Sequence, residues 1–123
     1  MSKVFYSKLI RDFIPKKILG NGEECEVRTI DDAEEFEQEL LKKVAEEAGA
    51  LSRTRSRDEF LEEYADLMVV LDSLTAHYEF SEADIKDALG RNIEKKGLFK
   101  EKFFLHWSSK GKYQSNETPQ GLQ

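Results

Sequence analysis

Three carboxylates occupy helix positions at which apolar side chains are expected. In the segment 36–51 the apolar side chains recur at the spacing of one helix face, namely Phe36, Leu40, Val44 and Leu51. Glu47 falls within this stripe, and Glu63 and Asp66 share one face of a second, almost entirely apolar helical segment. Carboxylates that point into a shared interior repel one another unless a cation lies between them. Because all of these ligands are oxygens, the pattern favours a hard ion, Mg²⁺ first and Mn²⁺ second.

Cationic and amide side chains follow in a third helical segment. Ile85 and Leu89 mark its inward stripe, and the same spacing continues to Asn92 and Lys96, with Lys95 beside them. The two lysines are suited to hold phosphate oxygens, and the Asn92 amide is suited to orient a ribose or phosphate. The acids could equally form salt bridges with cations elsewhere in the chain, namely Arg53, Arg55, Arg57 or Lys96. Spacing alone leaves both interpretations open.

The elements that must position these side chains are mainly helices. The predicted long helices run from Asp31-Asp32 to about Leu51, from Ser56 to about His77, and from Ser81 to Lys96. Each begins with a capping residue followed by acidic residues, and Gly97 provides a stop signal. The first segment predicts one short helix or turn on each side of Pro15, which disfavours a helical conformation at Ile14 and predicts a kink or break there. Residues 25–30 predict a short strand, and residues 99–105 predict a short extended piece that packs back on the helices. We therefore expect an all-α antiparallel helical bundle with short extended pieces near both ends.

Length and composition indicate one domain. The chain has 123 residues, of which 39% are hydrophobic and 36% charged, enough for one helical core. We expect a domain over residues 1–107 and a polar tail over 108–123. No apolar run approaches the roughly 18 residues of a membrane helix. With no secretory signal and a single cysteine, Cys25, the expected location is the cytoplasm, with no membrane partner.

Charge is distributed unevenly along the chain. The net charge is −6, which argues against nucleic-acid binding by a wholly basic surface. Residues 1–20 carry five Lys/Arg against one Asp, residues 23–63 carry 15 Asp/Glu against six Lys/Arg, and residues 91–112 carry seven Lys/Arg against two Glu. This order is compatible with simple solvation, and also with a carboxylate–metal cluster and cations that surround one polyphosphate.

Three motifs resemble those of the all-α nucleoside-triphosphate pyrophosphohydrolases, the MazG-like and phosphoribosyl-ATP pyrophosphohydrolase-like proteins. That family carries E-E-x-x-E followed, after a gap, by E-x-x-D. The corresponding residues here are Glu46-Glu47-Ala48-Gly49-Ala50 and Glu63-Tyr64-Ala65-Asp66. The run from Lys8 to Pro15, K-L-I-R-D-F-I-P, is similar to the KLVRDKIP opening of one subgroup, and residues 92–99 are similar to its basic helix end and glycine turn. The resemblance covers about residues 5–107.

The resemblance implies a Mg²⁺-dependent hydrolase that cleaves between the α and β phosphates of a nucleoside triphosphate. Carried over to this chain, the implied metal ligands are Glu47, Glu63 and Asp66. Beyond the resemblance, we expect Glu46 to act as a general base or auxiliary ligand, and the substrate-binding residues to be Lys8, Arg11, Asn92, Lys95 and Lys96. A homodimer or homotetramer is expected, since small helical domains with this much apolar surface often complete their cores between subunits.

The sequence departs from the family pattern at Ala50, which stands where the third Glu of E-E-x-x-E is expected. Mg²⁺ keeps several waters, so one fewer carboxylate can suffice, and Glu46 lies one turn earlier on the same helix edge. Alternatively, metal affinity falls and the protein binds a nucleotide without cleaving it. A third alternative is a helical bundle that serves only in oligomerisation.

Overall fold

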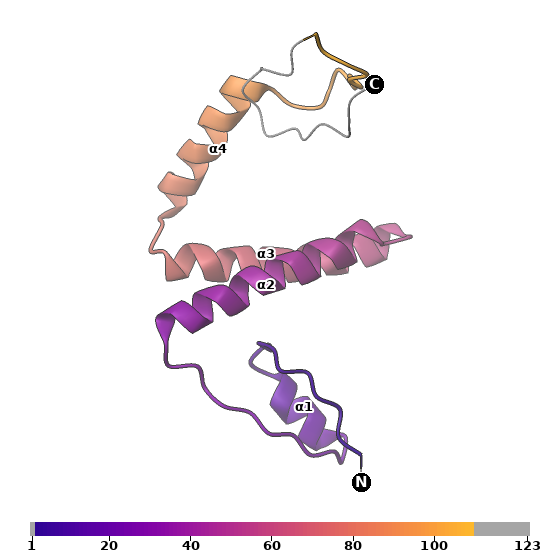
Figure 1. The fold of residues 1–123 in the computed structure, drawn as a ribbon, viewed down its shortest axis with the longest axis vertical. Helices are drawn as coiled ribbons and strands as arrows, with labels where there is room; N and C mark the ends of the chain where they lie inside the picture. The colour runs from indigo at the N-terminus through magenta and orange to yellow at the C-terminus, as the bar shows by residue number, and fades with distance from the viewer. Residues whose placement is uncertain (1, 110–123) are drawn as a thin grey trace. The chain divides into compact units, whose positions relative to one another are not determined.

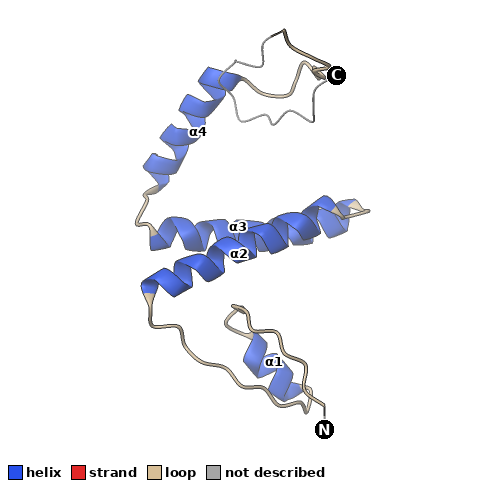
Figure 2. Ribbon diagram, viewed as in Figure 1, coloured by secondary structure: helices blue, strands red, loops and turns tan. Residues whose placement is uncertain are grey.

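The protein is all-helical in the residues that the computed structural model describes, 2–109, and no strand occurs among them (Figures 1 and 2). The helices are α1 (Ile14–Gly20), α2 (Ala33–Ser52), α3 (Arg57–His77) and α4 (Glu82–Lys96). The chain divides into two compact units, Met1–Ile85 and Lys86–Gln123. Of the predicted tail, residues 110–123 lie outside the described residues. The described helices include none with both the length and the apolar character of a membrane span.

The three long helices begin at the predicted capping residues. At α4 the capping box is complete: the Ser81 amide donates to Asp84 Oδ2 at 2.9 Å, and the Asp84 amide donates to Ser81 Oγ at 3.1 Å. At α3 the Ser56 hydroxyl accepts from the Glu59 amide at 3.1 Å. At α2 the Asp32 carboxylate accepts from the Glu34 amide at 3.3 Å. The caps fix where each helix starts, and therefore which side chains face the neighbouring helix.

Two predictions for the first 30 residues are wrong. The expected strand at residues 25–30 is an irregular loop, because alternation alone does not provide a partner strand for its backbone hydrogen bonds. Instead, the Arg28 guanidinium donates hydrogen bonds to both carboxylate oxygens of Glu35, with Nη1 at 3.1 Å from Oε1. These bonds link the loop to the start of α2. The turn and the helix expected on the two sides of Pro15 are both present, but Ile14, which we expect outside a helix, begins α1. Pro15 lies in the first turn of α1, where its missing N–H costs nothing.

The segment after α4 belongs to the second unit. Residues 99–105 form no helix or strand, and Phe99 and Phe103 are almost fully exposed. The packing of this segment on the long helices stays a prediction. The predicted end of α4 is correct: Gly97 has a φ of 78°, and its amide bonds to the Ile93 carbonyl oxygen at 2.7 Å.

The core lies between α2 and α3, which pack side by side (Figure 1). The connection of four residues, 53–56, is so short that the two helices must run antiparallel. Leu40 from α2 and Val70 and Leu74 from α3 are buried at this seam, with Leu9, Phe36 and Val44 packed against them. The predicted stripe of α2 therefore faces α3.

α3 is apolar on several sides, yet much of its apolar surface is exposed in the single chain. Only Val70 and Leu74 are buried in α3, whereas Leu61 keeps 63% of its surface exposed and Tyr64 is also exposed. Two packed helices share one contact surface, so packing on α2 buries only one face of α3, although α3 is apolar on several faces.

Candidate metal centre

The seam between α2 and α3 brings the three predicted acids together. Glu47 lies about one turn from the end of α2, and Glu63 and Asp66 lie in the first turns of α3. In an antiparallel pair these stretches face each other across the short connection. One carboxylate oxygen from each residue lies within 4.8 Å of the others, and all three side chains are partly buried. We call Glu47, Glu63 and Asp66 the acidic triad.

Within the acidic triad, the surroundings of Glu47 disfavour the negative charge of its carboxylate. Burial, followed by the negative charges of Asp66, Glu46 and Glu63, raises the pKa of the Glu47 carboxyl above its ordinary value, and Lys43 opposes the shift. Within residues 2–109, no lysine or arginine forms an ion pair with Glu47 or Glu63. Among the described residues, the carboxylates at this end of the seam therefore carry more negative charge than the lysines and arginines in direct contact with them neutralise.

The donor set fits a hard divalent cation. Oxygens that share one Mg²⁺ at about 2.1 Å lie roughly 3–4 Å apart, so side-chain rotation of about 1 Å would bring the acidic triad to that spacing. Three carboxylates with no nitrogen or sulfur ligand suit Mg²⁺ or Mn²⁺ rather than softer metals. Ala50 adds no oxygen, and any remaining positions on such an ion would belong to water or substrate.

Glu46 lies beside the acidic triad but is held by two lysines. Lys8 Nζ donates to Glu46 Oε1 at 2.7 Å, and Lys43 Nζ donates to Glu46 Oε2 at 3.1 Å. These two hydrogen bonds lower the pKa of the Glu46 carboxyl, and the bond to Glu46 raises the pKa of Lys8. Lys43 was not predicted, although it precedes Glu46 by three residues and so shares its helix face.

Arg11 approaches the acidic triad from the N-terminal segment. Its Nη1 lies 3.6 Å from Asp66 Oδ1, and both side chains remain substantially exposed. By contrast, in residues 2–109 none of the three arginines considered above as partners forms an ion pair with the acidic triad, namely Arg53, Arg55 and Arg57. The predicted substrate cations Lys8 and Arg11 therefore lie at the acids.

The other predicted substrate-binding residues belong to the second unit. Asn92, Lys95 and Lys96 lie on α4 beyond Ile85, where the first unit ends. The two lysines occupy its last turn, where cations interact favourably with the helix dipole.

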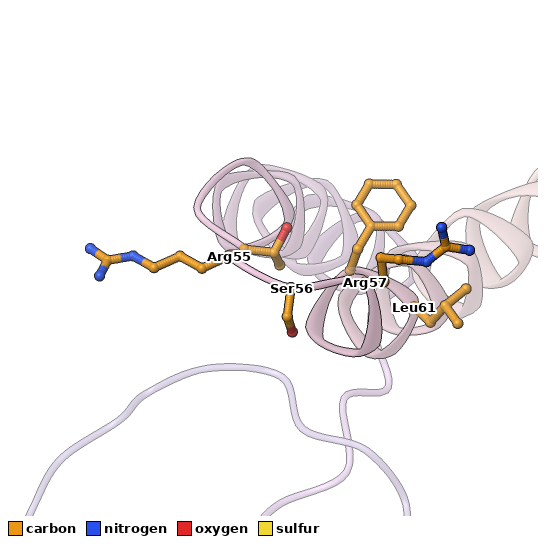
Figure 3. Close-up of a pocket in the computed structure, with 6 residues that line it drawn as sticks. Arg55, Ser56, Arg57 and Leu61 are labelled. Carbon is orange, nitrogen blue, oxygen red and sulfur yellow. The ribbon is translucent and has the colours of Figure 1, made fainter.

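A shallow hollow of about 590 Å³ lies at the start of α3 and does not include the acidic triad. Thr54, Arg55, Ser56, Arg57, Phe60 and Leu61 line it (Figure 3). Arg55 and Arg57 extend in opposite directions in this view, so they do not converge on one ligand. The residues that line this hollow include no carboxylate, whereas three carboxylates converge in the acidic triad.

No protein-family model matches the chain, and comparisons with curated proteins and with solved structures also found no match.

Proposed function

We propose that the protein is a Mg²⁺-dependent nucleoside-triphosphate pyrophosphohydrolase that cleaves between the α and β phosphates. The observation that supports this most directly is the convergence of Glu47, Glu63 and Asp66 within 4.8 Å on two adjacent helices. Mg²⁺ is the proposed cofactor, with Mn²⁺ as a substitute, and the acidic triad holds it. When bound, such an ion polarises phosphoryl oxygens and lowers the pKa of water.

The chain's own residues have separate roles in the proposed reaction. Lys8 and Arg11 move from Glu46 and Asp66 to the phosphate oxygens, where they offset the charge that develops as pyrophosphate leaves. Once Lys8 has moved, Glu46 becomes more basic and accepts a proton from the attacking water. Asn92, Lys95 and Lys96, in the second unit, stay predicted substrate-binding residues. One water is consumed, and the products are a nucleoside monophosphate and pyrophosphate.

The decisive experiment is a panel of nucleoside triphosphates with Mg²⁺ or Mn²⁺, followed by separate detection of phosphate and pyrophosphate. Pyrophosphate should form only in the presence of the metal. Glu63→Gln should lower turnover at least about 100-fold, because metal-based stabilisation of the transition state is worth several kcal/mol. Glu62→Gln is the matched control, since Glu62 neighbours Glu63 on α3 but is exposed. Unchanged turnover in Glu63→Gln, with intact helical circular dichroism, would remove this residue from the mechanism.

Ala50 favours one competing function, a module that binds nucleotide without cleaving it. Ala50→Glu restores the absent carboxylate one turn after Glu46 and Glu47. In the proposed enzyme this substitution should change turnover by less than about threefold, because water can fill the remaining positions on Mg²⁺. A large gain over an inert parent would instead identify a binding module whose metal site has been weakened.

Self-association belongs to the same proposal. A homodimer or homotetramer would cover apolar surface that the single chain leaves exposed. If the protein served only as an oligomerisation bundle, calorimetry with Mg²⁺ and a triphosphate would show no heat of binding.

A further inference from the structure

Arg53, the residue that follows the last turn of α2, folds its side chain back along the helix. Its guanidinium lies over Gly49: a Cβ atom added to Gly49 would be 3.3 Å from Arg53 Nη1, 3.9 Å from Nη2 and 4.0 Å from Cζ. A side chain at position 49 would therefore compete with the guanidinium for the same space. Glycine inside a helix is less favourable than alanine, so α2 carries a local cost at the position that the guanidinium covers.

The guanidinium of Arg53 shares one edge of α2 with the cations that hold Glu46. Lys43, Glu46, Gly49 and Arg53 follow one another at spacings of three, three and four residues, which keeps them on one side of a helix. Gly49 lies roughly 4.5 Å beyond Glu46 along the helix axis. The guanidinium and the two ammonium groups that donate to Glu46 therefore gather within about one helical turn.

Arg53 differs from the two lysines in its ion pairs. Lys8 and Lys43 both donate to Glu46, whereas within residues 2–109 no Asp or Glu lies within ion-pair distance of Arg53. A guanidinium presents five N–H donors in a planar fork that matches phosphate oxygens, and it is always charged. The Arg53 side chain thus places a positive charge that no described carboxylate neutralises by contact beside Glu46, the neighbour of Glu47 in the acidic triad.

We infer that Arg53 is a further substrate-binding residue, whose guanidinium holds phosphate oxygens of the triphosphate beside the acidic triad. The inference rests on the proposed function and adds a residue to it. A triphosphate carries a row of anionic oxygens, which suits three cations within about one helical turn. Lys8 must leave Glu46 to reach the phosphates, whereas Arg53 gives up no ion pair with a described acid.

A purely structural role for Arg53 predicts different results. A cation near the end of a helix interacts favourably with the helix dipole, so loss of the charge would lower Tm and leave substrate binding unchanged. Gly49→Leu separates the two roles. The three side-chain atoms nearest to the added Cβ all belong to Arg53, so leucine should displace the guanidinium. Because leucine is a strong helix former, the same substitution should maintain or raise Tm.

The test is calorimetric titration of the full chain with inorganic tripolyphosphate and Mg²⁺, together with KM for a nucleoside triphosphate. Arg53→Gln and Gly49→Leu should each weaken tripolyphosphate binding and raise KM about tenfold, the effect of one lost charge-assisted hydrogen bond. Arg53→Lys should give an intermediate loss, because it keeps the charge but not the planar fork. Arg55→Gln is the matched control, since Arg55 is exposed, lies two residues away and carries the same charge.

Failure of the inference and failure of the proposed function give different results. Mg²⁺-dependent pyrophosphate release by the wild type, with KM and tripolyphosphate affinity unchanged in Arg53→Gln, would overturn the inference alone. Absence of turnover, with tripolyphosphate binding weakened in Arg53→Gln but not in Arg55→Gln, would overturn the hydrolase and support Arg53 as a polyphosphate-binding residue. Equal weakening in these two variants, or a wild type that does not bind tripolyphosphate, would also overturn the inference.

Discussion

Glu47 is the member of the acidic triad whose charge the fold disfavours most clearly. Burial and the nearby Asp66 raise the pKa of its carboxyl, so the folded, metal-free protein holds a proton on Glu47 more tightly than the unfolded chain does. The stabilisation of the folded state by this proton is fully present below the pKa that Glu47 has in the unfolded chain. It is lost as the pH rises through the pKa that Glu47 has in the folded protein. Above that window the ionised Glu47 destabilises the metal-free protein.

Glu47→Gln should therefore stabilise the metal-free protein at neutral pH. Repulsion between like charges on helices costs about 0.2–0.5 kcal/mol, which corresponds to roughly 1–4 °C in Tm for a domain of this size. Thermal unfolding in a chelating buffer should show this gain at pH 7, and the gain should shrink as the pH falls toward 4. A variant that is less stable than the wild type at pH 7 would show that Glu47 is not under repulsion.

The acidic triad could be predicted from the sequence because helix periodicity reports which residues share a seam. Glu47 interrupts an apolar stripe that the structure places against α3, and Glu63 and Asp66 share the facing surface. Lys43 could not be predicted in the same way, because neither an apolar stripe nor a motif marks its position, and its partner Glu46 lies outside the stripe. Ion pairs across distant segments, such as Lys8 with Glu46, depend on chain folding that spacing does not report.

At the scale of elements, the N-terminal segment links the fold to the site. Leu9 packs against the core, while Lys8 and Arg11 on either side of it pair with Glu46 and Asp66. A single apolar anchor thus positions two cations at the acids. Because both ion pairs are exposed, each contributes little to stability, and the cations can exchange one anionic partner for another at small cost.

Lys8→Gln should therefore affect substrate binding more than folding. In the proposed enzyme, KM for the triphosphate should rise about tenfold, the effect of one lost charge-assisted hydrogen bond. Because Lys8 lowers the pKa of Glu46, the acid limb of the pH–rate profile should move to higher pH in the variant. Lys16→Gln on α1 is the control, since Lys16 is exposed and forms no ion pair within residues 2–109. An equal KM change in both variants would indicate only a general loss of positive charge.

The helices could be predicted because their sequence signals are local. Strand formation could not be predicted in this way, and the strand expected at residues 25–30 does not form. Ser56 and Ser81 cap helices at the expected residues through contacts three positions away. Residues 25–30 alternate as a strand would, but a strand also needs a neighbour elsewhere in the chain. In the structure that segment is instead fixed by the contact of Arg28 with Glu35.

At the scale of the whole molecule, the burial of α3 that its sequence predicts differs from the burial observed in the isolated chain. Its composition predicts a buried helix, and the single chain buries only Val70 and Leu74 of it. The periodicity of apolar residues indicates how many faces of a helix can pack against a neighbour. It does not indicate whether that neighbour belongs to the same chain or to another. The self-association included in the proposed function would reconcile the two observations.

Metal binding should also stabilise the whole molecule, because the acidic triad exists only in the folded state. A ligand present at 100 times its dissociation constant adds about 2.7 kcal/mol to the free energy of unfolding. For a domain of this size, that corresponds to a rise in Tm of roughly 10 °C. Thermal unfolding with Mn²⁺ or Mg²⁺, and no nucleotide, should show this rise in the wild type and a much smaller one in Glu63→Gln. NaCl at matched ionic strength is the necessary control, since salt also screens repulsion among carboxylates. An equal rise with NaCl would mean that the acids need only screening and that no metal is held by the acidic triad.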